Sequence, residues 1–212
     1  MKITNIRETV KKNPVLAILR GVSTDMLIDY VGAIKDGGVR FFEVALNTPD
    51  ALVQIKMLKA RFGDEIIVGA GTAITVKRAK AAVKAGADFL LAPSADEPVL
   101  KWCKRNGVAM LPGVLTPTDV SLSLKYGFDT LKLFPASDMP LSYVKSLKGP
   151  FDTTEYIAIG GISHTNASDF INAGCIGVGL GSNIAPKEAI KARDCKSITE
   201  AVKNLVSEVT KK

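Results

Sequence analysis

The sequence predicts a single (β/α)₈ barrel domain spanning residues 1–212, and three observations carry this prediction. The length of 212 residues fits one domain with a substantial core. Eight short apolar runs alternate with amphipathic stretches, which indicates right-handed βαβ units and a parallel sheet. The spacing of these runs is short and even, which favours a closed barrel over the alternative of an open, doubly wound sheet.

The predicted strands are apolar runs bounded by turn residues. Several follow a helix-like stretch that ends in glycine, as in IKDGGVRFFEVAL, VKAGADFLLAP and INAGCIGVGLG. Glycine suits the left-handed residue that closes a helix. The eight predicted strands cover residues 15–19, 41–45, 66–70, 89–92, 109–111, 130–133, 156–159 and 177–180.

The stretches between these runs predict helices, for example over residues 50–61 and 77–85. A final helix is expected over residues 197–209. Ser197 and Glu200 have the spacing of a capping box, so we expect Ser197 to begin this helix.

Composition and charge exclude several classes of protein. A hydrophobic fraction of 47% and a charged fraction of 23% argue against disorder, and no apolar run is long enough to span a membrane. The net charge of +7 is spread along helix-like segments and aromatic residues make up only 6%, so we expect no nucleic-acid partner. The N-terminus has no apolar signal region, so we expect a cytoplasmic protein.

The sequence predicts neither a metal site nor a cofactor. Cys103, Cys175 and Cys195 lack metal-ligand spacing, and their odd number fits reduced thiols better than a disulfide framework. Cys103 and Cys175 have apolar neighbours and are expected in the core. The only histidine, His164, lies in a polar stretch and is expected to be exposed and non-catalytic.

Lys132 interrupts the apolar strand Leu131-Lys132-Leu133, so alternation places it on the face opposite the two leucines. If that face is the barrel interior, desolvation lowers the lysine pKa from about 10.4 and supplies a neutral amine that attacks ketones. The alternative is a lysine whose head reaches water at the strand end.

Glu43 interrupts a second apolar strand, Phe41-Phe42-Glu43-Val44-Ala45, in the same way. A carboxyl group inside a barrel needs a partner or a raised pKa. Lys132 and Glu43 are therefore a candidate couple of nucleophile and general acid/base, with a structural ion pair as the alternative.

Polar and glycine residues at other predicted strand ends suggest an anion site. Gly160-Gly161 and Gly181-Ser182 follow the seventh and eighth strands, where such barrels usually bind phosphate through backbone N–H groups. Arg20 ends the first strand and has the planar fork that binds carboxylates, and Thr72 after the third strand offers a hydroxyl group.

The segments that carry these residues resemble the class I aldolases acting on 2-keto-3-deoxy-6-phosphogluconate, 2-keto-3-deoxy-6-phosphogalactonate and 4-hydroxy-2-oxoglutarate. The resemblance extends in order through nearly the whole chain. Its matching segments are AILRG (17–21), GGVRFFEVALNTPDA (37–51), IIVGAGT (66–72), LPGVLTPTD (111–119), LKLFPAS (131–137), IAIGGIS (157–163) and GVGLGS (177–182).

The resemblance implies a barrel enzyme without metal or cofactor, in which Lys132 is the Schiff-base nucleophile and Glu43 the general acid/base. It implies 2-keto-3-deoxy-6-phosphogluconate as the substrate, pyruvate and D-glyceraldehyde 3-phosphate as the products, and a homotrimer as the assembly. The implied substrate contacts are Arg20, Thr72, Pro93, Phe134, Gly160, Gly161, Gly181 and Ser182.

Two positions depart from the phosphogluconate-type pattern. Asn47 stands where those proteins often carry arginine, and Ile159 stands where they often carry threonine near the C4 region of the substrate. Both residues look more like the phosphogalactonate branch. That C4 epimer and 4-hydroxy-2-oxoglutarate are therefore alternative substrates, and another phosphate-binding barrel enzyme without a Schiff base is a remoter alternative.

Overall fold

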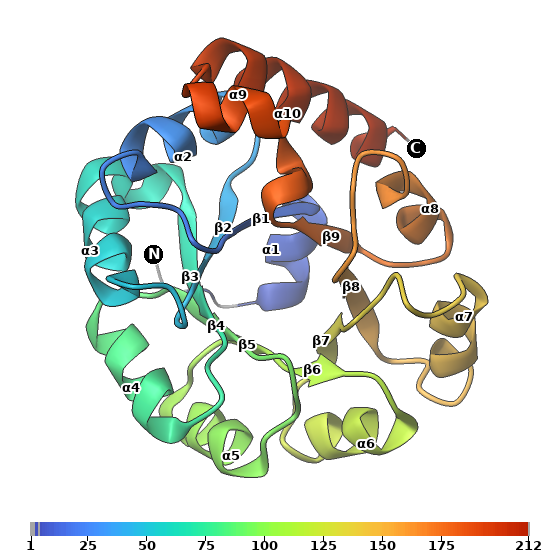
Figure 1. Cartoon of the computed structure of the whole chain (residues 1–212). Coiled ribbons are helices and arrows are strands. Elements are labelled where there is room, and N and C mark those ends of the chain that lie inside the picture. The colour runs from blue at the N-terminus through green and yellow to red at the C-terminus, as the bar shows by residue number, and fades with distance from the viewer. Residues whose placement is uncertain (1–2, 4, 212) are drawn as a thin grey trace.

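The computed structural model describes residues 3 and 5–211, which form a barrel of parallel strands surrounded by helices (Figure 1). Every strand pair is parallel, and the hydrogen-bonded order is β5-β4-β3-β2-β1-β9-β8-β7-β6. The strands are β1 (Val15–Leu19), β2 (Phe41–Ala45), β3 (Ile67–Gly71), β4 (Phe89–Leu91), β5 (Met110–Leu111), β6 (Gly113–Val114), β7 (Thr130–Leu133), β8 (Glu155–Ile159) and β9 (Gly177–Leu180).

The barrel closes through the segment that contains Pro112. The carbonyl of Leu111 accepts from Ala92 N–H at 3.4 Å on one side, and the carbonyl of Pro112 accepts from Lys132 N–H at 2.8 Å on the other. The single strand predicted over 109–111 is therefore wrong in detail, because the chain forms β5 and β6 on either side of a proline without an N–H group. The predicted barrel is confirmed, and the open-sheet alternative is wrong.

Helices cover the outside of the sheet in the alternating pattern that the sequence predicts (Figure 1). Gly107 ends α5 with a positive φ of 61°, as expected for a glycine that closes a helix. The helices are α1 (Ile6–Lys12), α2 (Leu27–Asp36), α3 (Ala51–Phe62), α4 (Val76–Lys84), α5 (Glu97–Asn106), α6 (Pro117–Lys125), α7 (Ser142–Lys148), α8 (Ala167–Asn172), α9 (Lys187–Ala192) and α10 (Cys195–Thr210), with short 3₁₀ turns η1 (Gly63–Glu65) and η2 (Ser182–Ile184).

Several predicted boundaries shift by a residue or two. The strand predicted over 66–70 is β3, that over 89–92 ends at Leu91, and that over 156–159 begins at Glu155. The predicted capping box of the last helix is wrong, because α10 starts at Cys195 and Asp194 is its N-cap. The Asp194 carboxylate accepts from Ser197 N–H at 3.1 Å, so Ser197 lies inside the first turn.

Alternation along the strands separates two hydrophobic layers. Leu131 and Leu133 belong to the outer layer that packs against the helices. The inner layer fills the barrel, where the Phe41 and Phe89 rings stack with their centroids 4.5 Å apart. Residues that alternate with the outer layer, Glu43 and Lys132 among them, therefore point into the barrel.

Helix α1 covers the amino end of the barrel and leaves the carboxyl end open. In Figure 1 it lies inside the ring formed by the other helices. Its residue Val10 belongs to the inner apolar layer, with Ile6 packed against that layer. Within the described chain no helix is long and apolar enough to cross a membrane.

Candidate active site

A pocket of about 310 Å³ opens at the carboxyl ends of the barrel strands, where enzymes of this fold place their chemistry. Eight of the ten predicted site residues line it, contributed by β1, β2, β7 and the loops after β8 and β9. The full lining is Ile18, Arg20, Glu43, Lys132, Phe134, Ile159, Gly160, Gly161, Ile162, Gly179, Gly181, Ser182 and Asn183.

Lys132 is buried at the centre of this pocket, with only 5% of its surface exposed. Burial lowers its pKa to about 8, and the positive charge of Arg20 adds to this effect. The negative charge of Glu43 opposes the shift without cancelling it. The Lys132 Nζ lies 4.5 Å from the centroid of the Phe134 ring, so the amine is packed on an aromatic face.

Glu43 is even more deeply buried, at 1% exposure. Burial raises the pKa of its carboxyl group, while the positive charges of Lys132 and Arg20 act in the opposite direction. No hydrogen bond or ion pair within 4.0 Å joins Glu43 to Lys132 in the described chain, so the two groups interact across the pocket rather than in a closed salt bridge. This arrangement leaves both side chains free to contact a small molecule between them.

Glycines lie beside both buried ionisable side chains, and one of them makes room for Glu43. Gly71 faces the Glu43 carboxyl group so closely that an added Cβ would lie 1.4 Å from Oε1. Gly113 is the register partner of Lys132 on the neighbouring strand β6. The site therefore depends on small neighbours as well as on the ionisable residues themselves.

The two glycine loops predicted to bind phosphate meet at one side of the pocket. Gly160 and Gly161 have positive φ values of 97° and 72°, which favour glycine, and an added Cβ on Gly161 would lie 1.7 Å from Ser137 Oγ. Gly181 and Ser182 approach from the end of β9. Backbone N–H groups on such loops are suited to an anion.

Two predicted contacts, Thr72 and Pro93, lie outside this lining. Thr72 has a positive φ of 59° and its hydroxyl lies 3.5 Å from Asn47 Oδ1 across the neighbouring loop. The backbone of Pro93 lies close to Gly113 on β6, where an added Cβ would be 2.2 Å from the Pro93 carbonyl carbon. Their direct contact with a substrate stays a prediction.

Sequence reasoning missed Asn183 and misplaced His164. Asn183 directly follows the predicted Ser182 and lines the pocket, which is the only signal that pointed to it. The expected exposure of His164 is wrong, because the ring is half-buried and its Nε2 lies 3.0 Å from the Ile184 carbonyl. It lines an adjoining pocket and not the one that holds Lys132.

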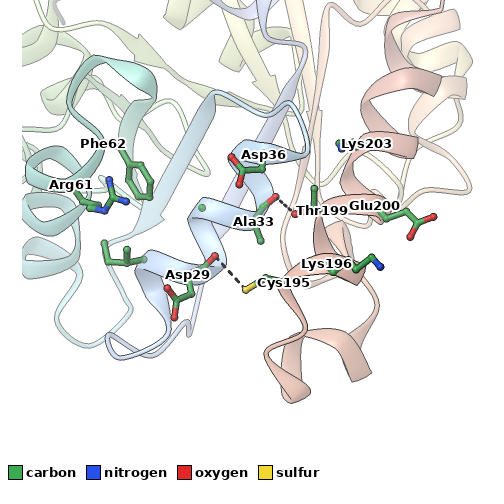
Figure 2. A pocket seen from close by; sticks show the side chains of 12 residues that line it. Asp29, Ala33, Asp36, Arg61, Phe62, Cys195, Lys196, Thr199, Glu200 and Lys203 are labelled. Atoms are coloured by element: carbon green, nitrogen blue, oxygen red, sulfur yellow. Dashed lines mark hydrogen bonds between the residues drawn. The ribbon is translucent and has the colours of Figure 1, made fainter.

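A larger pocket of about 750 Å³ lies outside the barrel, between α2, the end of α3 and α10 (Figure 2). Thr199 on α10 donates a hydrogen bond to the Ala33 carbonyl across its floor, at 2.9 Å. Its charged residues are all exposed and of both signs: Asp29, Asp36, Arg61, Lys196, Glu200 and Lys203. Size therefore does not identify the reactive site, whereas buried ionisable groups do.

The described residues contain no group of three or more His, Cys, Asp or Glu side chains that could hold a metal ion. Cys103 and Cys175 are buried, as expected, and burial raises the pKa of each thiol to about 12, so they remain protonated. The reactive groups of the pocket are thus an amine and a carboxyl group.

A (β/α)₈ barrel with a buried amine of lowered pKa and a buried carboxyl group at its open end defines a barrel enzyme. The chain belongs to the KDPG and KHG aldolase family, named after 2-keto-3-deoxy-6-phosphogluconate (KDPG) and 4-hydroxy-2-oxoglutarate (KHG), and the family profile matches residues 6–201. The protein is therefore an aldolase, a carbon–carbon lyase.

Curated relatives carry the names of two substrate epimers. A 2-dehydro-3-deoxy-6-phosphogalactonate aldolase of Escherichia coli is 34% identical over 82% of this chain and 85% of the relative. A KHG/KDPG aldolase of the same organism is 30% identical over 96% of this chain and 95% of the relative.

The fold comparison agrees with the sequence comparison. The crystal structure of a KDPG aldolase from Legionella pneumophila, with pyruvate captured as a covalent carbinolamine intermediate, matches with a TM-score of 0.88 and 28% identity. The match covers 95% of this chain and 98% of that one.

The fit of Glu43 against Gly71 gives a test of the site. We expect Gly71→Ala to displace the Glu43 carboxyl group and lower kcat for aldol cleavage by about 100-fold or more, the range for losing a general acid/base. Gly32→Ala on α2 is the control, because its added Cβ meets no atom within 4 Å. Equal activity of the two variants would show that the position of Glu43 does not matter.

Proposed function

We propose that this protein is a class I aldolase that cleaves a 2-keto-3-deoxy-6-phospho sugar acid through a Schiff base on Lys132. The observation that carries the proposal is the buried amine of Lys132, whose pKa is lowered to about 8. At pH 7 such an amine is neutral in roughly one molecule in ten, against roughly one in 2,500 for a lysine with the usual pKa of about 10.4.

In the proposed reaction the neutral Lys132 Nζ attacks the C2 carbonyl carbon of the substrate. The carbinolamine loses water and becomes an iminium ion. A base then removes the proton of the C4 hydroxyl, the C3–C4 bond breaks, and its electron pair moves to C3 and into the iminium nitrogen. The aldehyde D-glyceraldehyde 3-phosphate leaves, and the remaining enamine is protonated at C3. Water hydrolyses the resulting iminium ion, which releases pyruvate and restores the amine.

Glu43 is proposed as the acid and base for these proton transfers. Its carboxyl group opens on the same pocket as Lys132, and burial brings its pKa up from the usual range. A carboxyl group with a raised pKa exchanges protons more readily near neutral pH than an exposed one. Glu43 would protonate the carbinolamine hydroxyl as it leaves as water, take the proton of the C4 hydroxyl, and later protonate C3. No second acid/base side chain is then needed.

The remaining pocket residues are proposed to bind the two anionic ends of the substrate. Arg20 supplies a guanidinium group for the carboxylate, while the loops of Gly160, Gly161 and Ser182 supply N–H groups for the phosphate. Lys132 lines the same pocket as both groups, which supports a substrate that carries its ketone next to the carboxylate.

The C4 configuration of the substrate remains to be assigned between two candidates. The phosphogluconate epimer is the sequence prediction, with relatives of that name at 30% identity. The phosphogalactonate epimer is favoured by the relative at 34% identity and by the apolar Ile159 that lines the pocket. A comparison of kcat/KM for the two epimers and for 4-hydroxy-2-oxoglutarate decides between them.

Borohydride trapping tests the proposed nucleophile. We expect incubation with pyruvate and sodium borohydride to leave a reduced pyruvyl adduct on Lys132, located by mass spectrometry of peptides. Lys132→Ala should form no adduct and lose turnover while keeping its fold by circular dichroism. Lys101→Ala on α5 removes an exposed lysine and should behave as wild type. An active Lys132→Ala protein, or a folded wild type without any adduct, would refute the Schiff-base mechanism.

The lowered pKa of Lys132 predicts the pH dependence of the reaction. Only the neutral amine attacks the ketone, so kcat/KM should rise with pH and level off above an apparent pKa near 8. The measurement is kcat/KM between pH 6 and 10, which reports ionisations of the free enzyme. A rise centred near 10 would mean that Lys132 is solvated like an ordinary surface lysine.

We also propose that the chain assembles into a homotrimer through an apolar patch on α3, α4 and the loop between β3 and α4. Five large hydrophobic side chains are more than one-third exposed in the described chain, and four of them lie on these elements. They are Leu52, Val53, Ile74 and Val83. Exposed apolar side chains on neighbouring elements are typical of an interaction surface, and these four define the proposed patch. The cytoplasmic location expected from the sequence stays a prediction.

The patch predicts how single substitutions change the assembly. Val53 on α3 is half exposed and would be buried in the proposed interface. A charge there would lose its hydration, so Val53→Asp is expected to convert the trimer into monomers. Leu141→Asp removes the fifth exposed hydrophobic residue and should leave the trimer intact. Leu141 directly precedes α7, which lies across the barrel from α3 and α4 (Figure 1). Sedimentation velocity measures both, and a monomeric wild type would contradict the proposal.

A further inference from the structure

Arg20 lies in the loop after β1, and its side-chain contacts do not hold it in place. The side chain is exposed at the rim of the catalytic pocket and has no hydrogen bond or ion pair with any other described residue. The next residue, Gly21, has a positive φ of 68° and an open environment, which gives the backbone freedom to turn. Contacts from other segments to the backbone of this loop therefore limit where the guanidinium group can lie.

The side chain of Thr48 supplies one such contact. The Gly21 N–H donates to Thr48 Oγ1 at 3.1 Å, which joins the loop after β1 to the segment after β2. Thr48 is 8% exposed and does not line the catalytic pocket. Its own backbone is fixed by a hydrogen bond from Thr48 N–H to the Ala45 carbonyl at 2.9 Å, at the end of the strand that carries Glu43.

Gln54 on α3 supplies the second contact. Its Nε2 donates to the Val22 carbonyl at 2.8 Å and lies 3.3 Å from Thr24 Oγ1. Gln54 is 1% exposed, and its Oε1 is buried without a hydrogen-bond partner among the described residues. A buried amide with an unpaired oxygen costs stability, so an apolar residue would suit the helix packing better unless the amide N–H bonds serve another purpose.

We infer that Thr48 and Gln54 are positioning residues, which hold the backbone on the carboxyl side of Arg20 so that its guanidinium group faces the substrate carboxylate. This inference rests on the proposed function. The two contacts hold the consecutive residues Gly21 and Val22. Both contacts come from the segment that follows β2, the strand that carries Glu43. These contacts limit the movement of the backbone next to Arg20 relative to the segment that follows the Glu43 strand.

This arrangement predicts a change in substrate binding rather than in chemistry. Thr48→Val keeps the shape of the side chain but removes the acceptor for Gly21 N–H. We expect KM for the cleaved keto acid to rise about five- to tenfold, which is the effect of losing one intramolecular hydrogen bond. We expect kcat to change less than twofold. Thr48→Ser restores the acceptor and should return KM to the wild-type value.

A double-mutant cycle with Arg20→Ala separates positioning from general damage. If Thr48 acts through Arg20, then Thr48→Val raises KM in the wild-type background and has almost no further effect when Arg20 is absent. Asp25→Asn is the control within the same loop. It removes the charge that pairs with Arg193 but keeps a side-chain oxygen that can accept from Ser23, so it should leave KM unchanged. An equal effect of Thr48→Val in both backgrounds, or no effect in either, would overturn the inference.

Hydrogen–deuterium exchange tests the contacts independently of activity. Peptides covering residues 16–24 should exchange faster in Thr48→Val and in Gln54→Met than in wild type or Asp25→Asn. Unchanged exchange in both variants would overturn the inference even in an active enzyme. A wild type that forms no pyruvate adduct would instead remove the proposed function, and the exchange result would still decide whether Thr48 and Gln54 fix the loop.

Discussion

The desolvation of one amine is the constraint on which the arrangement of this barrel depends. An ammonium group strongly prefers water, and the interior of a (β/α)₈ barrel is filled with apolar side chains. Lys132 is placed there by strand alternation, because Leu131 and Leu133 are committed to the outer layer. The cost of burial appears as a pKa lowered to about 8, and that same shift makes the amine reactive.

The surroundings of Lys132 follow from this constraint. Glu43 lies on the same pocket and offsets part of the cost, since its charge favours the protonated amine. Arg20 acts in the opposite direction on the amine and keeps its pKa low. Glycine at position 71 gives the carboxyl group its space, and the Pro112 carbonyl beside β6 accepts a hydrogen bond from the Lys132 backbone N–H. The pocket therefore depends on glycine at position 71 and on the interruption of the sheet at Pro112, between β5 and β6.

The two ends of the barrel are treated differently by the chain. Helix α1 covers the amino end, where its apolar residues pack against the inner layer, and the candidate pocket opens at the carboxyl end. Hydrogen bonds join the loops at this end: Gly21 after β1 contacts Thr48 after β2, and Asn47 after β2 contacts Thr72 after β3. The family resemblance implies that Arg20 and Thr72 of these loops contact the substrate. The apolar packing of α1 and the candidate site therefore lie at opposite ends of the barrel, as is usual for this fold.

Local patterns in the sequence determined which residues face the barrel interior and where most strands and helices lie. The period of two along 130–133 and 41–45 is enough to place Lys132 and Glu43 opposite their apolar neighbours, because alternation is a property of the strand itself. Contacts between distant segments were decided only by the tertiary structure. The division of the fifth strand at Pro112, the burial of His164 against Ile184, the place of Asn183 in the pocket and the hydrogen bond from Gly21 to Thr48 all depend on backbone positions far apart in the chain. No periodic signal encodes such contacts, since they form only where strands and loops distant in the sequence lie side by side in the closed barrel.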